Sequence, residues 1–217
     1  MTRISNRLKA IVKFVSKKDK IVDVGCDHGL LSIYLVENNL VNKVIASDIN
    51  QNALNSAIKN INKRNLEIET VISDGVKNVN LSGINTLVIS GMGTGTILHI
   101  LSETKKIKNI KKLIIQSNND HELLRKEMNN KGYFLQDESY TFDKGKWYVT
   151  CLFYKSDEKN DEVTIKYGLL NNKDYNKYIL EHKKQIYKNV PWTSLKAKFR
   201  TLYKFYKLKK VISNIGK

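Results

Sequence analysis

The chain has 217 residues, of which 41% are hydrophobic, and its formal net charge is +17. This composition allows a sizeable core and excludes a disordered chain, and no stretch is apolar for long enough to cross a membrane as a helix. The first residues lack the apolar core of a signal peptide, and the two cysteines, Cys26 and Cys151, are too few for a disulfide framework. We therefore expect a monomeric cytoplasmic protein with reduced thiols. Its positive charge indicates either a polyanionic partner or a merely basic surface.

Up to about residue 155, short β-branched apolar segments alternate with longer segments of helical periodicity. Strands are predicted at 20–25, 43–48, 67–73, 84–91 and 111–117, and helices at 28–39, 50–65, 95–105 and 120–132. Repeated strand–helix units predict a parallel sheet with helices on both faces, a doubly wound, Rossmann-like α/β fold. Two successive strands, 133–142 and 146–155, predict a hairpin that adds an antiparallel strand at one edge.

The sequence changes character after the polar residues 156–161. Residues 161–217 hold 13 lysines and one arginine against four acids, a net charge of +10. Helices are predicted at 175–190 and 194–215, and the second carries one apolar stripe of Leu195, Phe199, Leu202, Phe205, Leu208, Ile212 and Ile215. We predict two domains, 1–157 and 158–217, the second a coiled-coil-like α-helical hairpin.

The segment "DVGCDHG" places Asp23, Gly25, Asp27 and His28 between the first predicted strand and the following helix. Glycine at position 25 permits a tight turn and a close approach of backbone to a ligand. An acid two residues before that glycine repels a pyrophosphate. It suits a ligand with positive charge, such as an ammonium or a sulfonium.

Two further acids end the next two predicted strands. Asp48 is placed to accept hydrogen bonds from ribose hydroxyls, and Asp74, followed by Gly75, to accept one from an adenine amine. With Asp23, these acids predict a binding site for S-adenosylmethionine, and ordinary strand-end or capping acids are the alternative. The predicted donor site also includes two residues next to these strand ends, Ile49 and Gly91.

The loop "SGMGTG" at 90–95 follows the fourth predicted strand, where methyltransferases meet the target atom. Met92 and Gly93 are predicted to hold a flat ring near the donor methyl group, and a plain glycine-rich turn is the alternative. Gln116 and Asn118, at the end of the fifth strand, are predicted to hydrogen-bond the base or the methyl donor, and a capped turn is the alternative. The one proline, Pro191, excludes the Asn/Asp-Pro-Pro-aromatic motif that is common in methyltransferases acting on exocyclic amines.

Four segments together resemble the bacterial family that methylates N1 of adenine 22 in tRNA. "VDVGCDHGLLSIYL" is similar to its D-I-G-S-D-H-x-x-L-P signature, and "VISGMGTGTILHIL" to its I-A-G-M-G-G-x-L-I segment. "LIIQSN" resembles L-I-L-Q-P-N, and "ISNRLKAIVKFV" resembles the N-terminal helix. Ser32 and Ser117 stand where the family has proline, and Thr94 where it has glycine.

The resemblance implies a class I methyltransferase fold over 1–157, S-adenosylmethionine as donor and tRNA as substrate. It implies an active-site role for Asp27 and for Arg7, while Asp23, Gly25, Asp48 and Asp74 match the donor site. His28 either assists or is structural.

The basic tail is predicted to bind tRNA. Its aromatic residues either stack on bases or form the core of the hairpin. The residues chosen as tRNA ligands are Lys183, Lys184, Lys198 and Arg200. No metal is expected. The alternatives are a methyltransferase acting on another RNA, and a non-catalytic RNA-binding protein with a retained donor-like pocket.

Overall fold

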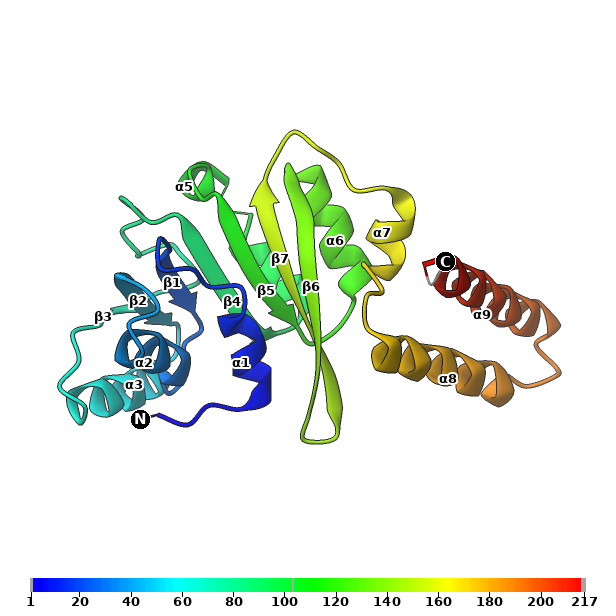
Figure 1. Cartoon of the computed structure of the whole chain (residues 1–217), viewed down its shortest axis with the longest axis horizontal. Helices are drawn as coiled ribbons and strands as arrows, with labels where there is room; N and C mark the ends of the chain where they lie inside the picture. Colours follow the sequence, from blue (N-terminus) through cyan, green and yellow to red (C-terminus); the bar gives the residue numbers. More distant parts are fainter. Residues whose placement is uncertain (1, 103, 216–217) are drawn as a thin grey trace. The chain divides into compact units, whose positions relative to one another are not determined.

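The computed structural model describes residues 2–102 and 104–215 (Figure 1). The chain divides into two compact units that meet between Asn160 and Asp161. The first unit contains the sheet and the second contains three helices of the basic tail, and each is described by itself.

The first unit is built on a seven-stranded sheet in the order β3-β2-β1-β4-β5-β7-β6. The strands are β1 (Lys20–Val24), β2 (Lys43–Asp48), β3 (Glu69–Ile72), β4 (Thr86–Met92), β5 (Lys112–Ser117), β6 (Tyr133–Asp143) and β7 (Lys146–Lys155). The helices are α1 (Asn6–Val12), α2 (Leu30–Glu37), α3 (Gln51–Asn62), α4 (Thr94–Ile100), α5 (Thr104–Ile107) and α6 (His121–Asn130). Strands β1 to β5 pair in parallel. The doubly wound fold predicted from the sequence is confirmed.

The hairpin of β6 and β7 lies at one edge of the sheet, as expected, but its antiparallel strand is not the outermost one. Strand β7 pairs antiparallel with both β5 and β6, so β6 forms the edge. Strand β7 takes the interior position because it is buried on both of its faces. Residues 149–153 of β7 are all buried, whereas buried and more exposed residues alternate along most of β6. A strand that is apolar on both faces favours an interior position.

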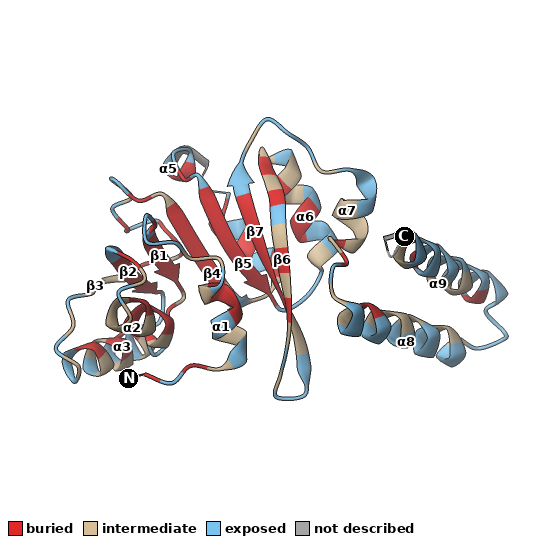
Figure 2. Ribbon diagram, in the orientation of Figure 1, coloured by how far each residue is buried: buried red, intermediate tan, exposed pale blue. Residues whose placement is uncertain are grey.

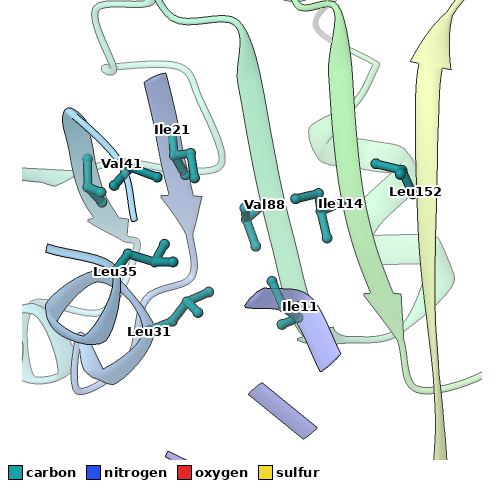
Figure 3. Close-up of a cluster of buried hydrophobic side chains, with 9 residues drawn as sticks. Ile11, Ile21, Leu31, Leu35, Val41, Val88, Ile114 and Leu152 are labelled. Carbon is teal, nitrogen blue, oxygen red and sulfur yellow. The ribbon is translucent and has the colours of Figure 1, made fainter. Parts of the chain in front are cut away.

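The core lies along the central strands, which are buried over most of their length (Figure 2). One cluster joins side chains of α1 and α2 to β1, β4, β5 and β7 (Figure 3). In it, Ile11 of α1 packs with Val88, Ile114 and Leu152 of three different strands. This packing fixes the N-terminal helix against the sheet.

Two predicted helices differ from those in the structure. The helix expected from residue 28 begins at Leu30, because Gly29 takes a positive φ of +69° at its N-cap. The helix expected over 95–105 is interrupted between α4 and α5. The first difference shapes the carboxyl edge of the sheet, where the loop after β1 lies.

The second unit contains α7 (Glu162–Tyr167), α8 (Lys173–Asn189) and α9 (Leu195–Ile215). Helices α8 and α9 form a hairpin, and Leu208 of the predicted stripe is fully buried. Leu195 and Phe199 are 56% and 69% exposed, so the stripe is not buried at the start of α9. Helix α7, which was not predicted, is capped by Asp161, whose side chain accepts from the backbone N–H of Thr164.

A buried ion pair stabilises the amino end of the sheet. Nζ of Lys112 lies 2.7 Å from Oδ2 of Asp19, and both residues are almost fully buried. Lys112→Met leaves the Asp19 carboxylate buried without its cation, so we expect a loss of about 3 kcal/mol in the free energy of unfolding. Urea denaturation at pH 7 measures it. The double variant Asp19→Asn, Lys112→Met is the control and should recover most of the loss.

Candidate active site

A cavity of about 470 Å³ opens at the carboxyl ends of β1, β2 and β4 and beside the loop that follows β3. Its walls bring together eleven of the residues predicted from the sequence: Arg7, Asp23, Gly25, Asp27, His28, Asp48, Ile49, Asp74, Gly75, Gly91 and Met92. Ligand sites of doubly wound sheets lie at this edge, and this volume is in the range of small-molecule sites.

The turn after β1 forms the floor of the cavity. The backbone N–H groups of Gly25 and Cys26 both donate to the carbonyl of Ser47, at 2.8 and 2.9 Å. Gly25 has a φ of +72°, and a Cβ at this position would lie 2.1 Å from Cε of Met92. The backbone conformation favours glycine here, and a Cβ would also displace the end of the Met92 side chain at the carboxyl end of β4.

Asp23 is the most deeply buried of the acids that line the cavity. It is 3% exposed, and Oγ of Ser32 donates to its Oδ2 at 2.7 Å. Burial raises the pKa of Asp23 to about 6, and the hydrogen bonds from Ser32 oppose this shift. Ser32, which replaces a proline of the related signature, thus contributes a donor to the site.

Asp48 connects two neighbouring segments. Its Oδ2 accepts from the backbone N–H of Asp27 and its Oδ1 from that of Asn50, both at 2.9 Å. Asn50 is the N-cap of α3, so Asp48 fixes this helix start and the Asp27 loop together. The neighbouring Ile49 is 67% exposed and adds apolar surface to the cavity wall.

Asp27 presents its carboxylate to solvent at the cavity wall. Its side chain is 71% exposed, and Oδ1 lies 3.7 Å from Nε2 of His28, which is itself 57% exposed. Asp27 has a φ of +52°, a conformation that few residues other than glycine adopt, although Asp and Asn tolerate it best. A strained residue with an accessible carboxylate is typical of functional sites.

Arg7 reaches the cavity from α1. Its Nη1 donates to Oε1 of Gln116 at 3.1 Å, and its guanidinium carbon lies 5.8 Å from the centre of the Tyr148 ring. Gln116 is fully buried, and its Nε2 donates to the Arg7 carbonyl and to Oγ1 of Thr150. Gln116 was predicted to contact substrate. It instead lies behind Arg7 and positions it, because its amide groups are engaged inside the protein.

Gly93 and Asn118 shape the loop after β4 and are not among the cavity-lining residues. Nδ2 of Asn118 donates to the Gly91 carbonyl at 2.7 Å, and its backbone N–H to the Met92 carbonyl at 2.9 Å. Gly93 is the N-cap of α4. Asn119, which the sequence did not single out, accepts from the backbone N–H of Thr94 and so fixes the start of α4.

The far wall contains Asp74 and two residues of α4. Nζ of Lys77 lies 2.6 Å from Oδ2 of Asp74, and this hydrogen bond holds the pKa of Asp74 below its usual value. His99 and Thr96 of α4 also line the cavity. They were missed because helical periodicity does not tell which residues of a helix face a ligand.

The tail residues predicted to bind tRNA have different environments. Lys184 and Arg200 are exposed, and Lys183 is half-buried. Lys198 is only 7% exposed, donates to the Val190 carbonyl at 3.0 Å, and lies 4.0 Å from the centre of the Trp192 ring. Its prediction as an RNA ligand is therefore corrected, because its ammonium is used within the α8–α9 connection.

Among residues 2–102 and 104–215, no three His, Cys, Asp or Glu side chains are grouped as they would be around a metal ion. Within the same residues, no helix combines the length and the apolar character that a membrane crossing requires.

The strand order 3-2-1-4-5-7-6, with one antiparallel strand and a cavity at the ends of β1 and β2, defines a class I methyltransferase. The family model described as "Methyltransferase domain" matches residues 4–151. A structure of M. capricolum TrmK in complex with S-adenosylhomocysteine has a TM-score of 0.83 and 30% identity, with 98% of this chain and 99% of that chain covered. The chain belongs to the TrmK family of methyltransferases.

Two further proteins support this assignment. The Bacillus subtilis tRNA (adenine(22)-N(1))-methyltransferase is 27% identical over 173 residues, which cover 77% of this chain and 73% of that protein. A Streptococcus pneumoniae protein solved in complex with S-adenosyl-L-methionine has a TM-score of 0.88 and 25% identity, with 97% of this chain and all of that chain covered. The recognition made from the sequence motifs is confirmed.

The raised pKa of Asp23 predicts a dependence of stability on pH. In the unfolded chain this carboxyl loses its proton near pH 4, and in the folded protein near pH 6. Protonated Asp23 therefore favours the folded state below about pH 4, and this contribution is lost as the pH rises through about 6.

Asp23→Asn removes the penalty of a buried carboxylate. We expect the variant to be more stable than the wild type at pH 8, by about 2–3 kcal/mol, and equally stable near pH 4. Urea denaturation at the two pH values measures the difference. A constant difference between the two proteins at all pH values would contradict the shift.

Proposed function

We propose that this protein transfers a methyl group from S-adenosylmethionine to N1 of adenine 22 in tRNA. The observation that carries the proposal is the accessible Asp27 carboxylate on the wall of a cavity whose acids end three successive strands. Its similarity to M. capricolum TrmK over 98% of the chain, and to the B. subtilis tRNA (adenine(22)-N(1))-methyltransferase over 77% of the chain, supports the choice of nucleoside and RNA.

The residues present fit S-adenosylmethionine. Gly25 leaves room that a Cβ would fill, Asp23 suits a cationic group, and Asp48 and Asp74 suit ribose hydroxyls and an adenine amine. Ile49 adds an apolar surface for a flat ring. When bound, the donor supplies an activated methyl group.

The chain itself has to hold the target adenine and exclude water. N1 carries an in-plane lone pair and needs no general base, so alignment and desolvation are the main tasks. In a duplex N1 is paired, and the base must be unpaired or extruded to reach the cavity. N1-methyladenine is cationic, so we assign to Asp27 the stabilisation of positive charge on the ring.

Arg7 is assigned to the same wall as a contact for the RNA near the adenine. Its guanidinium is held by Gln116 and Tyr148, which fixes its direction before RNA binds. His28 is assigned to support the Asp27 carboxylate, from which it lies 3.7 Å away.

We assign methyl transfer to residues 1–157 and tRNA binding to the basic residues 158–217. Exposed aromatic side chains lie among the lysines of the tail, and they suit stacking and phosphate contacts. They are Tyr178, Trp192, Phe199, Tyr203 and Tyr206. The cysteines at positions 26 and 151 are free and buried, which fits a cytoplasmic protein, and we propose that it acts as a monomer.

Incubation with total tRNA and labelled S-adenosylmethionine, followed by nucleoside analysis, tests the function. We expect N1-methyladenosine in the RNA. A transcript of a responsive tRNA with guanine at position 22 should remain unlabelled. Label in another nucleoside, or in ribosomal RNA only, would overturn the assignment, and failure to bind the donor in calorimetry would identify a non-catalytic protein.

Asp27→Asn should reduce the rate of N1-methyladenosine formation by at least about 100-fold, because the amide lacks the negative charge. Asparagine tolerates the positive φ of this position, so the variant should fold like the wild type. Its Kd for S-adenosylmethionine should stay within about two-fold of the wild-type value. Single-turnover kinetics and calorimetry measure the two quantities. Asn55→Asp, an exposed change of the same two residue types on α3, is the control.

Removal of residues 161–217 should weaken tRNA binding by at least about ten-fold and flatten its dependence on salt, because the basic contacts to phosphates are lost. Filter binding at several salt concentrations measures both. Affinity for S-adenosylmethionine should not change. A truncated protein with the tRNA affinity of the full chain would contradict the role assigned to the tail.

A further inference from the structure

The β6–β7 hairpin extends past the strand next to it. Strands β5 and β7 pair only from Lys112–Tyr154 to Ile115–Cys151. The β6–β7 ladder continues for five more residue pairs, from Ser139–Thr150 to Asp143–Lys146. At about 3.3 Å per residue, Lys146 lies about 13 Å beyond Thr150. Figure 1 shows this narrow ribbon reaching past the carboxyl ends of β4 and β5, the edge at which the cavity opens.

The tip of the hairpin carries an aromatic pair, of which Phe142 is exposed and Trp147 is half-buried. Phe142 and Trp147 lie opposite each other in the ladder, with ring centres 5.5 Å apart and planes inclined by 59°. Phe142 is 55% exposed. A two-stranded ribbon is only marginally stable, and a cross-strand aromatic pair supports it. That role does not require an exposed ring, so the exposed surface suits a further, binding role.

The same tip is basic. Lys144 is in the turn, and Nζ of Lys146 lies 5.3 Å from the centre of the Tyr148 ring. The one acid at the tip, Asp143, accepts from the backbone N–H of Arg7 and so serves α1. The tip therefore combines aromatic and cationic groups. This combination suits the binding of a nucleic-acid chain, because bases stack on aromatic rings and phosphates pair with cations.

The hairpin is continuous with the active site through Arg7. Successive residues of a strand point to opposite faces, so Tyr148 lies on the face opposite Phe142 and Trp147. Arg7 lies over Tyr148, is held by Gln116, and lines the cavity. Lys146 lies on the Tyr148 face, with its Nζ 5.3 Å from the centre of that ring. A chain that passes around the tip, from the aromatic pair to Lys146, is therefore led to the face on which Arg7 lines the cavity.

We propose that the tip of the β6–β7 hairpin is a binding site for unpaired nucleotides that flank the target adenine in the RNA. Phe142 and Trp147 stack on a base, and Lys144 and Lys146 contact phosphates. Extruding the target base leaves neighbouring bases without a stacking partner, and an aromatic platform beside the cavity replaces it. The inference rests on the proposed methylation of tRNA.

Removal of the rings is the first test. In the full-length protein, Phe142→Ala with Trp147→Ala should raise KM for tRNA and the Kd of the tRNA complex by about 5- to 100-fold. The Kd for S-adenosylmethionine should not change. The matched variant Phe142→Tyr with Trp147→Phe keeps both aromatic faces and should stay within about three-fold of the wild type. Equal loss in both double variants would show that the aromatic faces are not what binds the RNA, and it would overturn the proposal.

Lys144→Asn separates binding from hairpin stability. Lys144 and Gly145 both have positive φ, at +48° and +79°, and Asn-Gly is the preferred pair for such a two-residue turn. The variant should therefore be at least as stable as the wild type in thermal unfolding, yet bind tRNA more weakly. The slope of log Kd against log salt should decrease by about 0.7–0.9, the contribution of one phosphate contact.

Lys17→Asn, an exposed lysine before β1 and thus at the opposite end of the sheet, controls for net charge and should leave the slope unchanged. Unchanged tRNA affinity and salt slope in Lys144→Asn would overturn the proposal, even if the alanine variants do not fold. The wild-type protein is assayed in parallel for N1-methyladenosine. If the wild type forms N1-methyladenosine and the alanine variant has an unaltered KM for tRNA, the hairpin site alone is rejected. If the wild type forms no product, the proposed function is rejected.

Discussion

The active site depends on the tight turn that joins β1 to the loop before α2. Two adjacent N–H groups, those of Gly25 and Cys26, donate to the one carbonyl of Ser47, and Asp48 then accepts from the N–H of Asp27. These bonds run from the end of β1 to the end of β2. They bring the acids of two strands to one side of the cavity, next to Asp27, which has a positive φ. The strain at Asp27 is balanced by the Asp48 contact.

This arrangement concentrates negative charge in a strongly basic protein. Asp23, Asp27, Asp48 and Asp74 all line one cavity in a chain with a net charge of +17. The two signs serve different ligands. A cationic donor is attracted to the acidic cavity, whereas a polyanionic RNA is attracted to the lysines elsewhere in the chain and repelled from the floor of the site. The charge pattern therefore helps to separate the two binding sites without a conformational change.

Strand ends were the part of the site that sequence reasoning located well. In a parallel sheet all carboxyl ends meet at one edge, so Asp23, Asp48 and Asp74 could be grouped from strand positions alone. Side-chain direction was not accessible in the same way. Gln116 follows the same rule of position, but it lies behind Arg7, because Thr150 of β7 supplies a partner that no local pattern reveals. Lys198 shows the same limit, since its contacts with Val190 and Trp192 arise only when the helices pair.

The bonds that hold Arg7 join residues far apart in the chain. Its backbone N–H donates to Asp143, and Gln116, which binds its side chain, is anchored on Thr150. Helix α1, which is synthesised before the sheet, can therefore take its final position only after β6 and β7 have been made. Because contacts at such separation form late and slowly, completion of the reactive centre is tied to the final step of folding of the whole sheet. Nascent or partly folded chains would accordingly lack the means to act on RNA.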